Sequence, residues 1–594
     1  MILQRLIEYA DREGLGQDKD FGTKHVRWLI ELDGKGRLAG LTPLGVKEGK
    51  HRGEDLVGVP ETPQNEMQSP KVANFLVDSA ARVLDWPSPD ADDRERKKIG
   101  DKHLYFWTLI REFSGWSRKH AKDDRAAGAL LASRKDLKLI RSRLEKEKGR
   151  PTDNVAFSVA GRPCHELQLT RRFWSDRRKG LADHSAAEGA LAGLDLATGT
   201  LENHIALTHN KIRGVLGANS MGAPLVSNDK AAFQSYGLDA GLNAPVGISA
   251  EAKYRAALNT LVANGKPLGE ETTVAIWTKK KIPLDFWALI EADEGAVRQA
   301  FDAPITGRPD VLRLAEGKPN DFYALGLSGV GGRLMIRSWM ESTVEDVLRN
   351  VRSWFDHLAI VSQYGDRADR HFKLWALLFA IVREKADELP PPLPLQLLMC
   401  ALQGSAPPRV ALELAVRRNA RAAAGMPSLS DEDQARESSK LTARTALMKL
   451  CLIRSQQDTE VNASMKTQLD SEQNDPAYLC GRLLAVMDRL QYLALGKVGA
   501  GVVERTYGAA SATPGVVFGR LFRGAQTHIS KLEGKSGGAA ENVRKDFEEI
   551  CGHLQAWPKV LTLEGQARFA LGFYHQKADY RRRSQESKAE PDAR

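Results

Sequence analysis

Residues 211–237 hold the side chains best suited to reading nucleic acid. Lys211 and Arg213 open the segment with positive charge, and no further charge follows until Asp229. Asparagine and glutamine can form paired hydrogen bonds with base edges, and glycine lets a backbone approach a partner closely. A glycine-rich turn whose amides bond local backbone would explain the same composition. The candidate DNA contacts are Lys211, Arg213, Asn219, Ser220, Asn228 and Gln234.

Two arginine-rich segments could also hold phosphates. In 171–180, RRFWSDRRKG, arginines surround Phe173 and Trp174. Arginine grips phosphates and aromatic rings stack on unpaired bases, although the two rings could equally anchor a solvated helix to the core. In 417–425, RRNARAAAG, the arginines share one predicted helix face, which either follows a phosphate backbone or simply solvates the surface. The candidates are Arg171, Arg172, Arg177, Arg417, Arg418 and Arg421.

Lys71 and Asn74 form a further candidate pair. The sequence SPKVANF places them at the start of a helix predicted over 71–86. Anions are favoured at helix N-termini, so a phosphate could bind there. A helix start without a ligand explains the pattern as well.

The sequence contains no catalytic constellation that stands out. The run GLSGVGG at 326–332 lacks a Walker lysine and precedes a predicted strand, so it indicates a tight hairpin turn. The five cysteines never form a CxxC pair, and the histidines show no metal-binding spacing. There is no GxSxG elbow. We expect no enzymatic activity, metal or cofactor, although a catalytic carboxylate pair cannot be read from sequence.

The bulk composition favours a partner that carries negative charge. The 594 residues have a formal net charge of +10 and a pI of about 9.2, and nucleic acid is the commonest acidic partner. The chain lacks an apolar run long enough to span a membrane. Its N-terminus, MILQRLIEYADREG, predicts an amphipathic helix rather than a secretory signal. A cytoplasmic protein without membrane contact is therefore expected.

Hydrophobic periodicity predicts an α+β fold, with a mixed α/β N-terminal part followed by an all-helical C-terminal bundle. Strands are predicted in 25–33, 154–163 and 271–278, and a strand–turn–strand unit in 322–340. Helical spacing prevails after about 341, and the polar tail from 580 onward is expected to fray. The predicted parts are 1–340, a helical middle region 341–464, and a bundle 465–594.

Several segments, in their order and spacing, resemble the large subunit of the type I-C CRISPR Cascade complex, the Csd-type family. They are MILQRLIEYADR, ANFLVDSAARVL, FSVAGRPCHEL, KIRGVLGANSMGAPLVSNDKAAFQSYGLDAGLNAPV, ALGLSGVGGRLMIRSWME, DPAYLCGRLLAVMDRLQ and LGFYHQ. Local departures occur at Met221 and at Asn228–Asp229, where the family pattern leads us to expect SSG-like and SFN-like residues.

The resemblance implies a non-catalytic role in RNA-guided interference. Such a subunit recognises the protospacer-adjacent motif on duplex DNA, helps unwind it and supports the displaced strand, while guide pairing reads the target. Its implied partners are the backbone subunits, the guide-5′-end-capping subunit, small subunits and a helicase–nuclease. Residues 1–340 would then dock the motif, and 465–594 would be a small-subunit-like module that an internal start at Met465 also produces alone. A structural scaffold or a guide-RNA-processing nuclease are the alternatives.

Overall fold

The computed structural model describes residues 2–16, 20–45, 53–62, 64–67, 69–121, 124–187, 192–202, 204–297, 320–369, 371–384, 388–425, 430–455, 459–532 and 538–589. It divides into two compact units, unit 1 (1–265 and 327–336) and unit 2 (266–326 and 337–594). The segments just after 265 share a hydrophobic core with the following helices, and the predicted boundary at 340 stays a prediction. That residue 465 begins a separate module stays a prediction.

Unit 1 is built on a mixed sheet with the strand order β3-β2-β6-β5, and β7 pairs with β6. Strands β2 and β6 run parallel, with Trp28 opposite Val155 and Leu32 opposite Val159. A parallel pair needs a long crossover, and helices between the two strands supply it. The strands are β2 (Trp28–Leu32), β3 (Leu38–Pro43), β5 (Asp78–Ser79), β6 (Asn154–Val159) and β7 (Arg162–Pro163), and β1 (Phe21–Val26) pairs separately with β4 (Glu54–Pro60).

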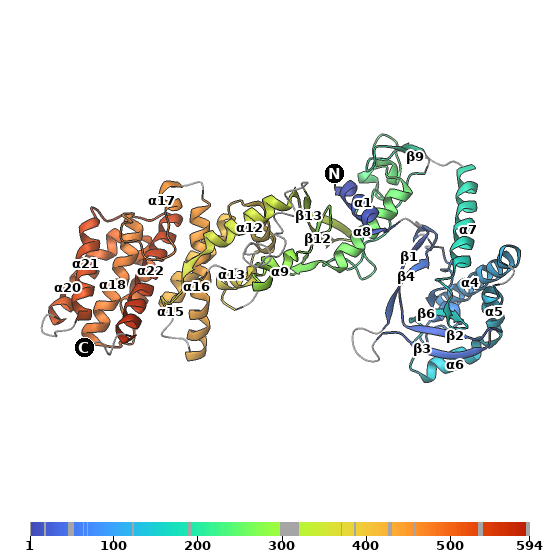
Figure 1. Cartoon of the computed structure of the whole chain (residues 1–594), viewed down its shortest axis with the longest axis horizontal. Helices are drawn as coiled ribbons and strands as arrows, with labels where there is room; N and C mark the ends of the chain where they lie inside the picture. The colour runs from blue at the N-terminus through green and yellow to red at the C-terminus, as the bar shows by residue number, and fades with distance from the viewer. Residues whose placement is uncertain are drawn as a thin grey trace, which may run out of the picture. The chain divides into compact units, whose positions relative to one another are not determined.

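Helices cover this sheet and close its core. The helices of unit 1 include α1 (Ile2–Glu13), α3 (Ala80–Val83), α4 (Asp93–His120), α5 (Ala126–Ala132), α6 (Leu137–Lys146), α7 (Gln168–Ala187) and α8 (Ile248–Ala263), labelled in part in Figure 1. Phe75 lies at the centre of an aromatic cluster: its ring is 5.4 Å from Phe113, 5.3 Å from Phe173 and 5.2 Å from Trp174. These rings join α4 and α7 to the segment before β5.

The helix predicted over 71–86 is wrong for most of its length. Residues 71–77 have no helical structure, and only α3 is helical within that range. Phe75 is fully buried in the aromatic cluster, and Leu76 adopts a left-handed backbone with φ of 65°. A left-handed leucine cannot continue an α-helix. Tertiary burial of neighbouring apolar side chains therefore overrides the helical spacing.

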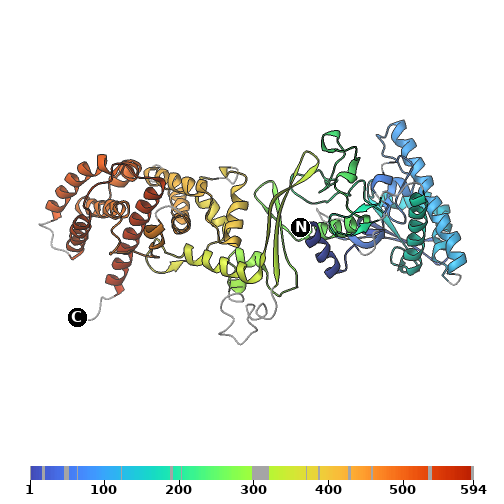
Figure 2. The same cartoon turned by 90° about the horizontal axis from the view of Figure 1, so that it is seen from above.

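The predicted strand–turn–strand unit is confirmed. Strands β12 (Asp321–Val330) and β13 (Arg333–Thr343) join through Gly331 and Gly332, whose φ values are 56° and 84°. Left-handed values at both positions suit a tight hairpin turn. With β10 (Lys266–Leu268) and β11 (Thr272–Thr278) they form a four-stranded sheet. Figure 2 shows the tip of this long hairpin beside the green loop of unit 1.

Unit 2 is mainly helical after β13, as predicted, apart from one short strand pair, β14 (Ile360–Val361) and β15 (Ala368–Asp369). Its longer helices are α12 (Val344–Leu358), α13 (Leu374–Ala380), α14 (Leu393–Gln403), α15 (Arg409–Gly425), α16 (Asp431–Ile453), α18 (Pro476–Leu495), α19 (Val502–Ala512), α20 (Pro514–Leu532), α21 (Gly538–His553) and α22 (Leu563–Ala589). The tail expected to fray is instead helical as far as Ala589, because Arg583 pairs with Asp546 of α21 at 3.0 Å. Residues 590–594 lie outside the described residues.

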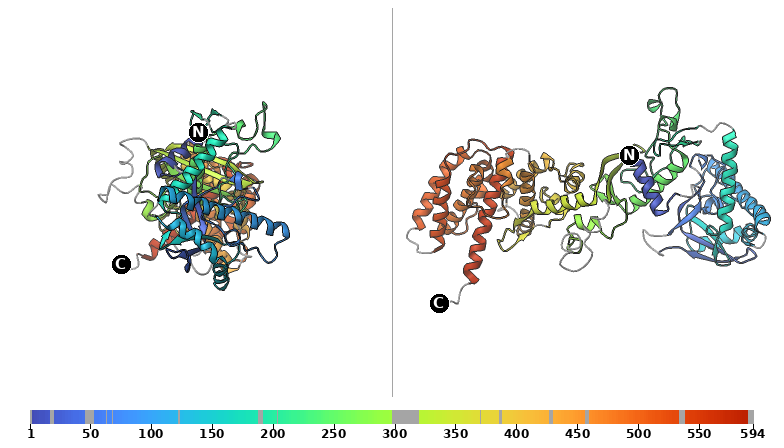
Figure 3. Two further views of the ribbon diagram at one scale, coloured as in Figure 1. Left: turned by 90° about the vertical axis from the view of Figure 1, so that its right-hand side faces the viewer. Right: turned by 45° about the horizontal axis from the view of Figure 1, so that its top comes forward.

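Helices α18 and α22 cross in direct backbone contact (Figures 1 and 3). A Cβ atom on Gly481 would stand 1.9 Å from the carbonyl oxygen of Phe569, and one on Gly572 would stand 2.1 Å from that of Tyr478. Two glycines therefore set the separation of these helices. Cores resist such additions because neither backbone can yield without moving a helix.

We predict that Gly572→Ala destabilises the chain by about 1–3 kcal/mol, although alanine is normally the better helix former. The matched control is Gly508→Ala in α19, where a Cβ atom would meet nothing within 4 Å. That change should instead stabilise the chain by roughly 0.5–1 kcal/mol. Denaturant unfolding of both variants measures the difference. Equal effects of the two substitutions would contradict the close crossing.

Candidate nucleic-acid interface

The buried carboxylate of Asp78 organises one part of unit 1. It accepts hydrogen bonds from the backbone N–H of Asn74 at 2.8 Å and of Ser79 at 2.7 Å, and from Arg82 Nη1 at 2.8 Å. Asn74 is buried, and its side-chain amide lies 3.4 Å from the same carboxylate. The reason for predicting Asn74 as a base reader, its place at a helix start, is therefore wrong. Lys71 is exposed and stays a candidate.

Lys24 of β1 is a cation that the sequence analysis missed. It is half-buried, and its side-chain Nζ forms no hydrogen bond or ion pair with any described residue. Burial lowers the pKa of Lys24 to about 8, and the positive charges of Arg213 and Arg82 act in the same direction. The carboxylates of Asp78 and Glu61 partly oppose this. Desolvation and neighbouring cations make the site receptive to an anion.

A second lysine strengthens this local excess of positive charge. Lys102 of α4 is buried, and its Nζ donates to the backbone oxygen of Met67 at 3.3 Å. Burial, followed by the charge of Arg82, lowers the pKa of Lys102 to about 8. We call the group Lys24, Arg82, Lys102 and Arg213 the β1 cation cluster. Sequence reasoning could not find it because its members are far apart in the chain and lack a shared motif.

The loop at 211–237 is closed and fixed by contacts within unit 1. Ile212 and Ala223 exchange backbone hydrogen bonds of 2.9 and 3.0 Å. The hairpin tip lies against the loop, and Gly329 N–H donates to Leu216 O at 2.7 Å. A Cβ atom on Gly217 would stand 2.6 Å from the oxygen of Gly329. The glycine here thus serves close packing against the chain's own hairpin rather than approach to a partner.

The predicted readers of this loop differ in how far they reach solvent. Asn219 and Ser220 are exposed, and the Asn219 side chain makes no hydrogen bond with a described residue. Asn228 and Gln234 are half-buried, and Gln234 Nε2 donates to the backbone oxygen of Asn228 at 3.1 Å. The local-turn interpretation therefore holds for Gln234, whereas Asn219 and Ser220 keep free polar groups.

The two predicted phosphate contacts lie at the foot of this loop. Arg213 is exposed, and its backbone N–H donates to Asn259 Oδ1 of α8 at 3.0 Å. That bond fixes the backbone at the start of the loop, and the charge of Arg213 contributes to the lowered pKa of Lys24. Lys211 is half-buried. The loop therefore begins with a member of the β1 cation cluster.

Tyr236 is presented to solvent by a braced turn. Tyr236 and Gly237 have φ values of 54° and 70°, and Leu238 N–H donates to Ser235 O at 2.9 Å. Asn243 accepts from Ser235 N–H and donates to Leu238 O, at 2.9 and 2.7 Å. The Tyr236 side chain is 98% exposed. A bulky residue held at positive φ stores strain, a feature that concentrates at functional sites.

The hairpin also supports the loop through Arg333. Its guanidinium pairs with Asp229 at 2.8 Å and lies 3.9 Å from the ring centroid of Phe233. Hydrogen bonds from Ser227 and then Arg333 hold the pKa of Asp229 below its usual value. These contacts fix the half of the loop that precedes Tyr236.

The segment 171–180 is mainly a structural element. Phe173 and Trp174 are buried, so they cannot stack on bases, and the core-anchor interpretation is correct for them. Arg177 pairs with Glu112 at 2.9 Å and is half-buried. Arg171 is exposed with its guanidinium over the ring of Phe21, and Arg172 is exposed and unpaired among the described residues. The predicted stacking is therefore wrong, and Arg172 stays a candidate phosphate contact.

The arginine row on α15 is split between two faces. Arg417 and Arg421 are exposed and make no ion pair with described residues. Arg418 points inward and pairs with the buried carboxylate of Glu437 on α16. The prediction that all three share one accessible face is wrong, because Glu437 draws the middle arginine into the helix interface.

A second cation-lined surface lies where the parallel strands β2 and β6 end. A cleft of about 480 Å³ is lined by Lys35, Arg37, Arg125 and Arg162. Asp33 accepts from the backbone N–H groups of Lys35 and Arg37, both at 2.8 Å, which fixes the turn at 33–37. Ligands of sheets commonly bind beyond the carboxyl ends of parallel strands. We call this the β2–β6 cleft, and the sequence analysis did not identify it.

No metal-binding group appears in the part of the chain that the structure describes. A cluster of three or more His, Cys, Asp or Glu side chains arranged for a metal ion is absent there. Burial raises the pKa of the Cys164 thiol to about 12 and lowers the pKa of the neighbouring His165. Cys164 therefore lacks the low thiol pKa of a reactive cysteine. Among the described helices, none is long and apolar enough to cross a membrane.

Unit 1 therefore has a cationic group beside the closed loop that carries exposed Asn219 and Ser220. A comparison with protein families matches residues 6–581 to the family described as CRISPR-associated protein (Cas_Csd1). The chain belongs to this family of CRISPR-associated proteins, which confirms the resemblance. A comparison with curated proteins finds no match.

We predict that DNA binding through Lys24 weakens as pH rises through about 8, where its ammonium loses the proton. At pH 9 about a tenth of such groups stay charged, so the affinity for a short duplex should fall up to about tenfold from its value at pH 7. Lys24→Arg keeps its charge and should bind with little change between the two pH values. Titrations at one fixed salt concentration measure this, since affinity for DNA depends on salt.

Lys24→Met serves as the matched neutral variant. It should bind weakly at both pH values, because the charge is absent throughout. Parallel decline of the wild type and Lys24→Arg would show that another group causes the pH dependence.

Proposed function

We propose that this chain is the non-catalytic large subunit of a type I-C RNA-guided interference complex. It would recognise the protospacer-adjacent motif on duplex DNA, help unwind the duplex, stabilise the displaced strand and recruit the helicase–nuclease. The observation that carries the proposal is the family match along residues 6–581. The arrangement of unit 1 supplies chemistry suited to the DNA part of this role.

Phosphate contacts in this proposal come from the β1 cation cluster. Arg213 is exposed and Lys24 lacks a hydrogen-bond partner among the described residues, so both can turn toward an anion. Asn219 and Ser220, exposed on the same closed loop, are the base readers. Phosphate contacts position a duplex and base contacts select its sequence, so the two groups have different roles.

Tyr236 is the wedge in this proposal. Its ring is 98% exposed on a turn that Asn243 braces from both sides. Stacking on an unpaired base tolerates any sequence, because every base has a π-face. A rigid aromatic beside the readers would stabilise the first opened base pair after the motif.

The remaining partners follow from the family and the charge distribution. The guide-bearing backbone subunits, the guide-5′-end-capping subunit and the small subunits are the proposed protein neighbours. The β2–β6 cleft and the exposed Arg417 and Arg421 offer further phosphate contacts for strands that leave the motif site. The proposed location is the cytoplasm, where guide RNA and target DNA meet.

Two alternatives make different measurable claims. A guide-RNA-processing or DNA-cutting enzyme would show metal-dependent cleavage by the purified chain, as such hydrolysis needs an activated nucleophile. A structural scaffold would bind its partner subunits but show no preference for the sequence that flanks the target. Cleavage assays with and without Mg²⁺ separate the first alternative from the proposal.

The assembled complex should bind duplexes with a strong preference among trinucleotides next to one fixed protospacer. Asn219→Ala should flatten that preference, with a loss of about 1–3 kcal/mol on the preferred flank, because it removes a base reader. Lys211→Ala should weaken every duplex alike and reduce the salt dependence. A flank preference that neither change alters would remove the loop from motif reading, and a complete absence of preference would favour the scaffold.

Replacement of Tyr236 should impair opening of the duplex rather than choice of motif. With 2-aminopurine at the first protospacer positions, Tyr236→Ala should reduce the fraction of opened DNA, since stacking contributes about 1–3 kcal/mol per base. Tyr236→Phe retains the ring and should open DNA as the wild type does. If Tyr236→Ala opens DNA normally, the exposed ring is not the wedge.

A further inference from the structure

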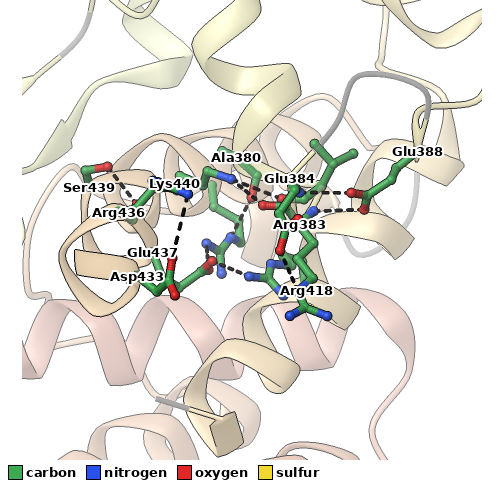
Figure 4. Close-up of polar contacts among 12 residues, drawn as sticks. Ala380, Arg383, Glu384, Glu388, Arg418, Asp433, Arg436, Glu437, Ser439 and Lys440 are labelled. Carbon is green, nitrogen blue, oxygen red and sulfur yellow. Dashed lines mark hydrogen bonds and ion pairs between the residues drawn. The ribbon is translucent and has the colours of Figure 1, made fainter. Parts of the chain in front are cut away.

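A buried ionic group on α16 carries more positive than negative charge. Glu437 pairs with Arg418 of α15 and with Arg444, which lies about two turns further along the same face of α16. Figure 4 shows part of this group. Arg444 is completely buried and also donates from Nε to Ala380 O at 2.8 Å. One carboxylate thus serves two guanidinium groups. A buried charge without a counterion is costly, so this group favours a second anion.

Lys440, one turn from Glu437, adds to the imbalance. Its Nζ donates to the backbone oxygens of Val382 and Arg383, at 3.4 and 2.8 Å. Carbonyl oxygens satisfy its N–H groups but do not neutralise its charge. Burial lowers the pKa of Lys440, and burial also lowers that of Arg444. Both directions indicate that the cationic forms are incompletely compensated.

Two N–H groups of the arginines have no acceptor among the residues that the structure describes. Arg444 Nη1 and Arg418 Nε are buried there without a hydrogen-bond partner. Buried donors are satisfied in almost all native proteins, and an exception calls for a ligand or a water. For Arg444 this unused donor belongs to a side chain that also lines a cavity.

The cavity lies between α15, α16, α19 and α22 and has a volume of about 230 Å³. Tyr507, Phe573 and Tyr574 supply aromatic walls, and Asn419 and Gln363 supply amides. Asn419 Nδ2 donates to the Tyr507 hydroxyl at 2.7 Å, which fixes that ring. The volume is below the roughly 300–1,000 Å³ of pockets for drug-sized ligands. It suits a ligand no larger than about one nucleotide.

The lining of the cavity also includes two cations of α22. They are Lys577 and Arg581, and Arg581 Nη1 donates to the backbone oxygen of Gln363 at 2.7 Å. Lys577 pairs with Asp488 at 3.1 Å across to α18. Glu504, the other acid in the lining, accepts from the backbone N–H of Gly501 at 2.7 Å. The lining thus holds three cations, Arg444 among them, and two acids.

We propose that this cavity binds a nucleoside monophosphate, either free or as the terminal nucleotide of a strand. Its phosphate would accept from Arg444 Nη1, and its base would pack against Tyr507 and Phe573. The family description does not mention such a site. The proposal does not depend on the DNA-reading role of unit 1.

The test is isothermal titration of the full chain with adenosine 5′-monophosphate, adenosine, inorganic phosphate and a 5′-phosphorylated oligothymidine. Adenosine 5′-monophosphate should bind saturably with one site per chain. Adenosine and phosphate should each bind at least about tenfold more weakly, because each lacks one half of the contacts. Tighter binding of the oligothymidine would assign a strand end as the ligand, and the reverse order would assign a free nucleotide.

Ala423→Leu fills the cavity from α15 without altering any charge, and it should abolish binding while the chain stays folded. Ala424→Leu, on an exposed position of the same helix, is the matched control and should bind as the wild type does. Arg444→Met combined with Glu437→Gln should also abolish binding. Phosphate that binds as tightly as the nucleotide, no saturable binding at all, or unchanged binding by Ala423→Leu would each overturn the proposal.

Discussion

One buried carboxylate, that of Asp78, is the constraint on which the candidate interface depends. Its oxygens accept hydrogen bonds from Asn74, Ser79 and Arg82. It is also the acid with the largest effect on the pKa values of Lys24 and Lys102. The carboxylates of Asp78 and Glu61 are outnumbered by the four cations of the β1 cation cluster, so this region keeps a residual positive charge. Residual charge held by rigid backbone is what attracts a phosphate without the entropy cost of ordering a flexible side chain.

Glycine allows close contact between backbone segments in both units. In unit 1 it lets the loop at 211–237 lie against the hairpin tip, where Gly217 meets Gly329. In unit 2 it lets α18 and α22 approach at Gly481 and Gly572. Close backbone contact fixes both arrangements, so the exposed side chains near the loop are held in place by packing rather than by their own interactions.

The arginines separate into those that hold the fold and those that face solvent. Arg418 and Arg444 share Glu437, and Arg178 bonds Glu66 at 2.8 Å. Such pairs replace water around a buried charge and are costly to break. Exposed arginines such as Arg172 lack this role in the fold. Charge counts over the whole sequence mix the two groups, so a net charge does not say which cations face solvent.

Sequence alone determined the family, the α+β class, the hairpin at 322–340 and the helical second half, because periodicity and turn residues are local properties. It failed at 71–77, where Phe75 is drawn into the aromatic core, and at Phe173 and Trp174, whose burial no local pattern reveals. The tertiary structure decided which cations stay free. Arg418 finds a carboxylate on another helix, whereas Lys24 finds no partner among the described residues. Pairing between residues far apart in the chain depends on how the elements pack, and packing is not encoded in any short segment.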